Sequence, residues 1–553
     1  MRIFSALLAR AMACATSGAL LAIVGVLALC ATPVFGQNGS RSWTGNTSTD
    51  FYDGDNWSAA GNYPNGNVTF VDSALTGSAN TTINRTSGTY SYIYGLYFNN
   101  TLNTENIYTI NGSTKVFLGG SVVRTSAVTG GSLTDVINAN FQQAGAAEVF
   151  NLGQNHHLDV NGVISGSNTF TKSGLGTLTL SGTNTYTGNT TISAGTLSVT
   201  GAGSLRSGTY AGAIANNGIL TLDTSAAQTL SGVISGTGAL TKSSTGTLTL
   251  SGTNTYTGNT TIGAGTLSVT GAGQLGSGTY AGAIANSATL TFATSADQTL
   301  SGVISGTGAL NKSSTGTLTL SNTNTYNGLT TATAGTLDVT GSIGGALTVN
   351  GGTVTTDASG SVGGALTMTT GSISPGTRTS NGTLNVTGNS TWTGGTYVWS
   401  VSGGMADSGS NASSGGSDTY NEASGTLGTD WDSMVFTGSL DFDGASAGSI
   451  TIEIDSNGTY TGYDWDKTTE VKIIGASSIA NFDASFFNLD SSGFDDNVGS
   501  WWVNWGIANH DNALWLQYKA VPEPSTYLMI LGLLLLPLRL WWRKNESKND
   551  SII

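Results

Sequence analysis

The sequence repeats itself over a long, fixed period. Residues 161–230 align with residues 231–300 without a gap, and 54 of the 70 positions are identical. A third, partial copy covers residues 301–340. A fixed period of this length is typical of solenoids, in which each unit packs only on its neighbours. The period therefore points to a stacked architecture rather than to a compact globule.

Each copy contains short runs in which apolar and hydroxyl residues alternate. The first copy has such runs at 176–180 and 195–199. A period of two predicts half-buried strands. Glycine and asparagine cluster between the runs, at 181–184 and 186–189. We interpret these clusters, which include Asn184 and Asn189, as turns, because both residue types tolerate left-handed backbone angles.

A strand of five residues cannot bury one face alone, but it can when copies of it stack about 4.8 Å apart. Leu, Val and Ile then form inner columns, and Thr and Ser form outer ladders. Only two prolines, Pro64 and Pro375, lie between residues 37 and 520, as expected where most backbone N–H groups join a ladder. We predict an all-β fold: a parallel, right-handed β-helix over residues 85–395 with about 20–24 residues per turn.

The strings that carry these strands resemble a known family, the autotransporter-associated β-strand repeat or passenger-associated transport repeat. Residues 176–197 and 246–267 match its pattern, and residues 316–337 match more loosely, with departures at Asn322, Asn327 and Leu329. The resemblance implies a β-helical, exported and surface-displayed passenger. Conventional passengers are followed by a membrane barrel of amphipathic strands, whereas this sequence continues into a short apolar tail.

The N-terminal segment has the pattern of an export signal. Arg2 and Arg10 precede an apolar stretch at 19–31, and small residues follow it. This order predicts a signal peptide at 1–36 that is cut after Gly36, with an uncleaved membrane anchor as the alternative. The two cysteines of the chain both lie in this segment, so the rest of the chain has no disulfide and no thiolate metal site.

The C-terminal segment, residues 521–553, resembles a PEP-CTERM sorting tail. Its sorting motif is followed by an apolar run, 527–542, and by basic side chains. A helix of that length spans about 24 Å, less than the roughly 30 Å hydrocarbon core, which suits a temporary stop in the membrane. The resemblance implies that an exosortase-type enzyme recognises the motif and removes the tail. The motif residues are Pro522, Glu523 and Pro524, and the membrane-flanking basic residues are Arg539, Arg543 and Lys544.

Two regions flank the predicted coil. Residues 37–84 are expected to form an N-terminal β cap, in which Trp43 and Trp57 plug the end of the column or, alternatively, bind sugar. Residues 396–520 hold 17 of the 32 acidic residues together with many aromatics. We expect a small C-terminal β domain there, followed by a hydrophobic helix in the tail. Four tryptophans of this domain are expected to form its core or, alternatively, to stack on sugars if they are exposed. They are Trp465, Trp501, Trp502 and Trp505.

The sequence offers little for catalysis or metal binding. Residues 161–400 contain nine charged residues and no obvious carboxylate pair, and His156 and His157 are adjacent, so a strand would point them to opposite faces. We therefore predict no catalytic residue and no cofactor. The weak Ca²⁺ candidates are carboxylate pairs two residues apart that complete no EF-hand loop, and solvated loops are the preferred interpretation. They are Asp441 with Asp443 and Asp464 with Asp466.

Composition and signals together predict an exported, non-enzymatic, structural or adhesin-like protein of the cell surface or extracellular matrix. It would be tethered to the membrane by its tail until processing. The net charge of −14 argues against nucleic acid as a partner. The expected partners are the exosortase, exopolysaccharide and other β-helical surface proteins. The alternatives are a Ca²⁺- or glycan-binding module at 396–520 displayed on a stalk, and a polysaccharide-acting β-helix enzyme.

Overall fold

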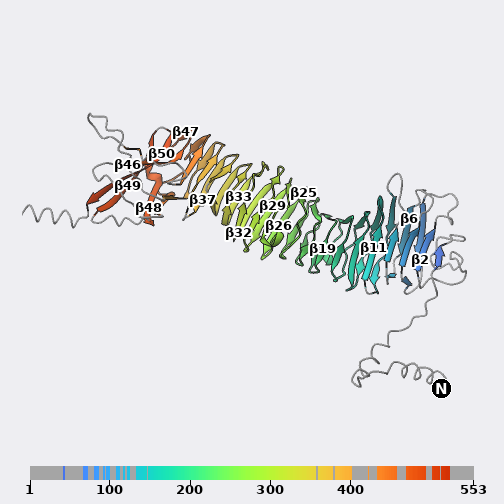
Figure 1. The fold of residues 1–553 in the computed structure, drawn as a ribbon. Coiled ribbons are helices and arrows are strands. Elements are labelled where there is room, and N and C mark those ends of the chain that lie inside the picture. The colour runs from blue at the N-terminus through green and yellow to red at the C-terminus, as the bar shows by residue number, and fades with distance from the viewer. Residues whose placement is uncertain are drawn as a thin grey trace, which may run out of the picture.

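The protein forms a long rod of short strands, with the chain advancing along the rod axis from one end to the other (Figure 1). The all-β prediction is confirmed. Among the described residues the only helical segments are the three-residue 3₁₀ turns Arg206–Gly208, Gly276–Gly278 and Ala484–Phe486, and none of these could cross a membrane. The computed structural model describes residues 41–43, 67–71, 80–85, 91–93, 95–99, 107–112, 116–118, 121–124, 133–145, 147–356, 359–377, 380–401, 421–422, 432–456, 469–493, 501–510 and 512–522.

The coil has three faces, each a ladder of parallel strands. Face 1 contains β11 (Ala147–Leu152), β14 (Thr169–Ser173), β16 (Thr190–Ile192), β19 (Ile214–Asn216) and β22 (Ile234–Ser235). Face 2 contains β12 (His156–Val160), β15 (Thr177–Leu180), β17 (Thr196–Gly201), β20 (Ile219–Thr224), β23 (Ala239–Lys242), β25 (Thr260–Ile262), β28 (Ile284–Asn286) and β31 (Ile304–Ser305). Face 3 contains β10 (Phe141–Gln143) and β13 (Ile164–Ser165), then β18 (Thr209–Tyr210), β21 (Gln228–Leu230), β24 (Thr247–Leu250), β26 (Thr266–Gly271), β29 (Thr289–Thr294) and the first part of β32 (Ala309–Leu320).

Burial follows the predicted alternation. In β15 the leucines are fully buried, whereas Thr177 and Thr179 are half-exposed. The next rung repeats this pattern with buried Leu197 and Val199. Because the strands pair in register, like side chains stack on like. The inner columns of Leu, Val and Ile and the outer ladders of Thr and Ser are therefore present as expected. The hand of the coil stays a prediction.

The sequence repeat is not a whole number of turns. On face 2, Leu178 pairs with Leu197, which pairs with Leu220, which pairs with Leu240, so three turns carry the chain from Leu178 to Leu240. The repeat ends farther along the chain. The equivalent of Leu178 one repeat later is Leu248, and it lies on face 3. Each repeat thus advances three turns and one face, and its copy is rotated by a third of a turn about the rod axis.

The ladder breaks confirm this rotation. β13 ends the first ladder of face 3, β22 ends that of face 1, and β31 ends that of face 2. The three strands begin at Ile164, Ile234 and Ile304, which are equivalent positions of successive repeats. Across the first break the two successive turns are still joined by a backbone hydrogen bond, which Thr185 N donates to Ile164 O at 2.8 Å. The break is thus one structural feature that appears once in each repeat, on a different face each time.

A buried asparagine side chain fills each break. Asn254 Oδ1 accepts a hydrogen bond from Ile234 N at 2.9 Å, and its Nδ2 donates to Gly252 O at 2.9 Å and to Gln274 O at 3.1 Å. The side-chain amide therefore takes the place of a peptide group in the ladder. Asn184 and Asn324 make the equivalent bonds one repeat away on either side.

The interpretation of Asn184 as a left-handed turn residue was wrong. Among the described residues the non-glycine positions with positive φ are Asn155, Arg206, Ser207, Ser277, Asn481 and Asn512. Asn184 is absent from that set and is fully buried. Short polar side chains are favoured in turns because they bond to nearby backbone. Here the same ability serves a ladder between turns of the coil, which the sequence pattern alone does not distinguish.

The ladders continue beyond residue 396, where composition suggested a new domain. β41 (Gly395–Val401) pairs in parallel with β45 (Ile450–Ser456), which pairs in parallel with β48 (Phe487–Gly493). Buried Ile450, Ile452 and Ile454 keep the alternation of the coil. Composition changed while the period of two persisted, and the period decides strand pairing. At the other end, β1 (Arg41–Trp43) pairs in parallel with β2 (Asn67–Val71), so the described strands of the expected cap also belong to a ladder.

An antiparallel pair ends the described chain. β49 (Trp501–His510) pairs with β50 (Ala513–Pro522), and β50 also runs antiparallel to β46 (Thr469–Gly475). β46 is itself part of the parallel ladder that continues face 2, through β43 (Ser433–Phe436). The hairpin therefore covers a strand edge that would otherwise expose unpaired backbone groups.

Replacing the ladder asparagine should unfold the middle of the rod more easily. Asn254→Leu leaves Ile234 N buried without a partner, while Gly252 O and Gln274 O each keep one backbone donor, so we expect a cost of about 2 kcal/mol. We expect a lower urea midpoint, followed by far-UV circular dichroism. Thr255→Ala, at the exposed neighbouring position, is the control. Equal midpoints for Asn254→Leu and the wild type would show that the amide is not part of the ladder.

Candidate functional surface

The outward side of each repeat carries a grid of side chains that are nearly all hydroxyl-bearing, three rungs high and two positions wide. Every grid position is half-exposed or exposed, and the strands pair in register. Along a strand the two columns are about 6.6 Å apart, and the rungs are about 4.8 Å apart. Grid 1 consists of Thr177, Thr179, Thr196, Ser198, Ile219 and Thr221; grid 2 of Thr247, Thr249, Thr266, Ser268, Thr289 and Thr291; grid 3 of Thr317, Thr319, Thr336, Asp338, Thr353 and Thr355.

The three grids lie on three different faces. Grid 1 is on face 2 and grid 2 is on face 3, because β15, β17 and β20 belong to the former and β24, β26 and β29 to the latter. Grid 3 lies on the second part of β32 and its neighbours. There Leu318 pairs with Gln298 of β30 (Gln298–Leu300), which continues face 1. The one-third rotation of the repeat produces this arrangement.

One position in the middle rung is neutral in grids 1 and 2 and carries a carboxylate in grid 3. Ser198 lies between Thr179 and Thr221, and Ser268 has the same place in grid 2. In grid 3 the equivalent residue is Asp338. Thr319 Oγ1 donates to its Oδ2 at 3.2 Å, and Thr355 Oγ1 donates to its Oδ1 at 3.1 Å. Hydroxyls one rung above and one rung below therefore converge on a polar group at this position.

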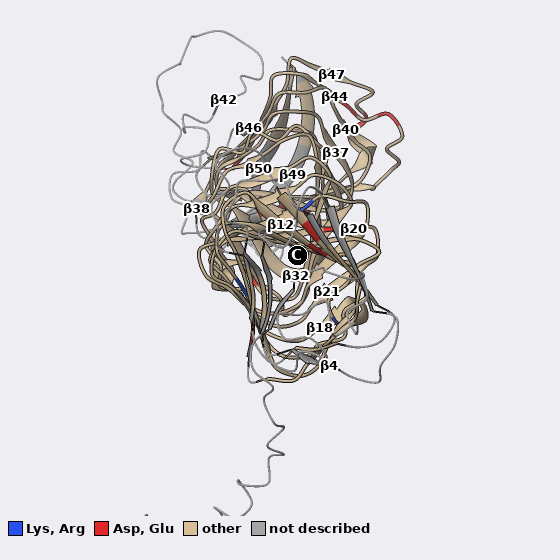
Figure 2. Ribbon diagram, turned by 90° about the vertical axis from the view of Figure 1, so that its right-hand side faces the viewer, with Lys and Arg blue, Asp and Glu red and all other residues tan. Residues whose placement is uncertain are grey.

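The surface around the first two grids is almost uncharged, and few charged segments appear in the view down the rod (Figure 2). Residues 161–330, all described, contain six charged residues. Three of these are lysines that are at most 1% exposed. The exposed or half-exposed charged side chains of residues 161–330 are those of Arg206, Asp223 and Asp297. A partner of this surface must therefore be recognised by hydrogen bonding and shape.

The three lysines lie inside the coil, one on each face. Lys172 is in β14, Lys242 in β23 and Lys312 in β32. The ammonium of Lys172 donates to Ser173 O and Gly174 O at 2.8 Å each, and to Ala194 O of the next turn at 3.3 Å. Burial lowers the pKa of Lys172 to about 8. The lysines thus tie successive turns together and are not available to a ligand.

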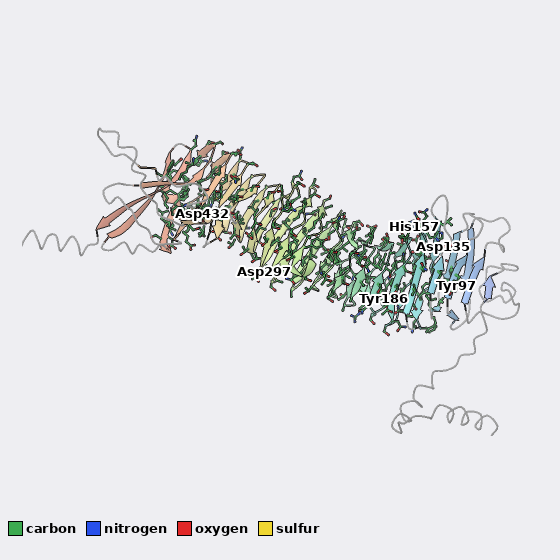
Figure 3. All side chains as sticks on the ribbon, in the orientation of Figure 1. Tyr97, Asp135, His157, Tyr186, Asp297 and Asp432 are labelled. Atoms are coloured by element: carbon green, nitrogen blue, oxygen red, sulfur yellow. The ribbon has the colours of Figure 1, made fainter. Side chains whose placement is uncertain are left out.

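Two buried carboxyl groups have contrasting surroundings. Asp432, near the C-terminal end of the rod (Figure 3), accepts hydrogen bonds from Gly382 N at 2.8 Å and Ser400 N at 3.1 Å. Burial still raises its pKa to about 7. Glu148 is fully buried in β11, and neither of its oxygens reaches a hydrogen-bond donor among the described residues. Its pKa is raised to about 8 by burial, which the nearby amides of Gln143 and Ala144 only partly oppose.

The sequence-predicted chemical candidates are not brought together. His156 points into the core and His157 points outward, as the alternation predicted. No group of three His, Cys, Asp or Glu side chains suited to a metal ion occurs in the described part of the chain. Asp441 Oδ1 instead accepts from Asp443 N at 3.0 Å and from Asn481 Nδ2 at 2.7 Å, which makes this pair a hydrogen-bonded loop.

Several predicted residues cannot be placed. Asp464 and Asp466, Trp57 and Trp465, and the signal segment 1–36 lie outside the described residues. So does the tail beyond Pro522, with Glu523, Pro524, Arg539, Arg543 and Lys544. Pro522 is the last residue of β50. The side chains of Trp43, Trp501, Trp502 and Trp505 are not described, although their backbones are strands.

Comparison with known proteins supports the repeat assignment. Residues 170–199, 240–269 and 310–339 match the Passenger-associated-transport-repeat family. Three segments of the chain thus match the passenger-associated transport repeat. Each matched segment begins near one of the buried lysines and runs through the first two rungs of one hydroxyl grid. The family pattern therefore covers the buried lysine and two of the three rungs of each grid.

One curated relative is an autotransporter adhesin. The Adhesin BmaC autotransporter of Brucella suis biovar 1 (strain 1330) is 38% identical over 216 residues, which is 35% of this chain. The match covers only 6% of that relative's length. The solved structure of the Haemophilus influenzae Hap adhesin aligns over 85% of this chain and 66% of its own, at 12% identity and a TM-score of 0.28. That similarity is too low to support a conclusion.

Removing the unpartnered carboxyl should change how stability depends on pH. The folded pKa of Glu148 is about 8, against 4.5 for the ordinary group, so the fold favours the protonated form. The contribution of Glu148 to stability is then greatest below pH 4.5 and falls as pH rises to about 8, by about 5 kcal/mol. Glu148→Gln should abolish most of this fall. Melting curves at pH 5 and pH 8.5 measure it.

The matched control for this prediction is Asp159→Asn, which removes a half-exposed outward carboxyl from β12, the next strand of the same turn. It should lose stability with rising pH as the wild type does. If Glu148→Gln loses as much stability as the wild type over this range, the buried carboxyl is not responsible.

Proposed function

We propose that this chain is an exported, non-enzymatic, adhesin-like rod that binds neutral polysaccharide at the cell surface. The observation that carries the proposal is the nearly uncharged hydroxyl surface over residues 161–330, where only Arg206, Asp223 and Asp297 contribute charge. Hydroxyl and amide groups at regular spacing match the donors and acceptors of a polymer of neutral sugars. The adhesin relative supports the surface role.

The affinity of such a surface comes from the number of hydrogen bonds rather than from the strength of each one. A single exposed hydrogen bond contributes about 1 kcal/mol or less. A polymer that contacts many hydroxyls at once gains avidity without any deep pocket. A regular rod suits a regular polymer, since both present the same group at fixed intervals. Such binding does not use the carboxylate pair with which glycosidases cleave sugar bonds. In this proposal the rod therefore binds the polymer without hydrolysing it.

Delivery to the surface is part of the proposal. The sequence at 1–36 supports export, and the PEP-CTERM-like tail at 521–553 supports sorting by an exosortase-type enzyme. In that scheme Pro522, Glu523 and Pro524 are the recognised motif, and the apolar run with Arg539, Arg543 and Lys544 holds the precursor in the membrane. The rod is then released from its tail on the outer side.

Binding to neutral polysaccharide should be nearly independent of salt. Because the polymer is neutral and the surface is nearly uncharged, the dissociation constant for hydroxyethyl cellulose should change less than about twofold between about 0.05 M and about 0.5 M NaCl. Dextran sulfate, an anionic polymer, should not bind the acidic chain. Affinity electrophoresis or sedimentation measures both. A strong salt dependence, or a preference for the anionic polymer, would contradict the proposal.

Sorting should depend on the tripeptide. The double substitution Glu523→Ala and Pro524→Ala should leave the precursor uncut and in the membrane fraction of a host that has an exosortase-type enzyme. Pro522 is kept because it ends β50. Ser547→Ala, farther along the tail, should be processed normally. Fractionation and mass measurement of the C-terminus decide the outcome, and release of the double variant at the wild-type level would rule out this motif.

A further inference from the structure

The geometry points to a rod that cross-links neutral polysaccharide strands, rather than one that adheres along a single side. This inference rests on the proposed function and specifies how the binding surface is arranged. Its basis is that equivalent surface residues of successive repeats lie on successive faces. Grid 1 is on face 2, grid 2 is on face 3 and grid 3 continues face 1.

The one-third rotation separates the grids in two ways. Successive grids are three turns and one face apart, which is about 16 Å along the axis, and they point in different directions because they lie on neighbouring faces of the three-faced coil. The buried columns of Leu178 and Leu248 lie between them. A single extended sugar chain that runs parallel to the rod axis stays on one face. It can contact the grid on that face, but it does not reach the next grid, which lies on another face. Two grids therefore engage two chains.

The grids are not equal in charge, and this sets the number of neutral contacts. Grids 1 and 2 have Ser198 and Ser268 at the centre, whereas grid 3 has Asp338. The carboxylate of Asp338 already binds Thr319 and Thr355, so these hydroxyls are occupied and the site is anionic. Asp223 flanks grid 1 at the next outward position of β20, but none of the positions that make up grids 1 and 2 is charged. The rod thus presents two grids without a charge of their own on adjacent faces, which is the minimum for a cross-link.

The chain supplies its own test substitutions. Asp338 shows that aspartate fits the central position in the same register, with partners from both neighbouring rungs. Ser198→Asp and Ser268→Asp therefore convert a neutral grid into the grid 3 type without disturbing the coil. Asp338→Ser makes the reverse change. Ser287→Asp adds the same charge at an exposed position outside the grids and is the control.

The experiment follows binding and cross-linking separately. The full chain is mixed with hydroxyethyl cellulose, binding is measured by affinity electrophoresis, and cross-linking by light scattering. Each single variant, Ser198→Asp or Ser268→Asp, should still bind but should lose the scattering increase. The double variant should bind at least about tenfold more weakly. Asp338→Ser should scatter more strongly than the wild type, and Ser287→Asp should equal it.

The alternative outcomes are distinguishable. If both single variants cross-link as the wild type does, or if one of them abolishes all binding, the two-face arrangement is wrong while polysaccharide binding stands. If the wild type does not bind the polymer, the proposed function fails as well. Scattering by the rod alone would identify a second copy as the partner and overturn the cross-linking of sugar chains. Should an aspartate variant lose its melting transition, Asp338→Ser decides alone, and unchanged scattering would overturn the inference.

Discussion

Backbone pairing between successive turns is the interaction on which everything else in this rod depends. Each strand is short, and none could bury an apolar side alone; the ladder brings equivalent residues into register and so creates the inner columns. Where the chain cannot continue as a strand, Asn184, Asn254 and Asn324 supply an amide in place of the missing peptide group. The lysines act similarly at the corners, by donating to carbonyls that the turns leave open. The polar residues inside the coil are thus substitutes for backbone, and this explains why they recur once per repeat.

Much of the fold could be predicted from the sequence, because alternation and period are local properties. Gly176 to Leu180 alternates strictly, and the structure makes β15 from it with buried leucines and outward threonines. The rotation of the repeat could not be predicted in this way. It depends on the summed length of the three turns between Leu178 and Leu240, which is eight residues shorter than the repeat, and the loop of 3₁₀ geometry at Arg206–Gly208 that lengthens one of these turns has no distinctive spacing. Sequence similarity between repeats suggested similar position, whereas the coil places similar residues on different faces.

The difference between a residue's place in the sequence repeat and its place in the coil also affects the candidate site. The outward threonines were expected as ladders along the rod, and they are outward. Their grouping into three separate grids follows only from the register, which brings Ser198 between Thr179 and Thr221. The burial of Lys172, Lys242 and Lys312 was also not expected, because lysine is ordinarily a surface residue. Its recurrence at a fixed position within a period-two strand was the signal that could have indicated it, since Lys172 occupies an inward phase between Phe170 and the turn.

The rotation also has a mechanical consequence. Each ladder break, at Ile164, Ile234 or Ile304, is a point where hydrogen bonding between turns is carried by a side chain and a few backbone groups instead of a full strand. Three breaks on one face would give the rod a soft side toward which it would bend. Because the breaks fall on three faces in turn, the compliance is shared around the circumference, and a pull from any direction meets the same resistance.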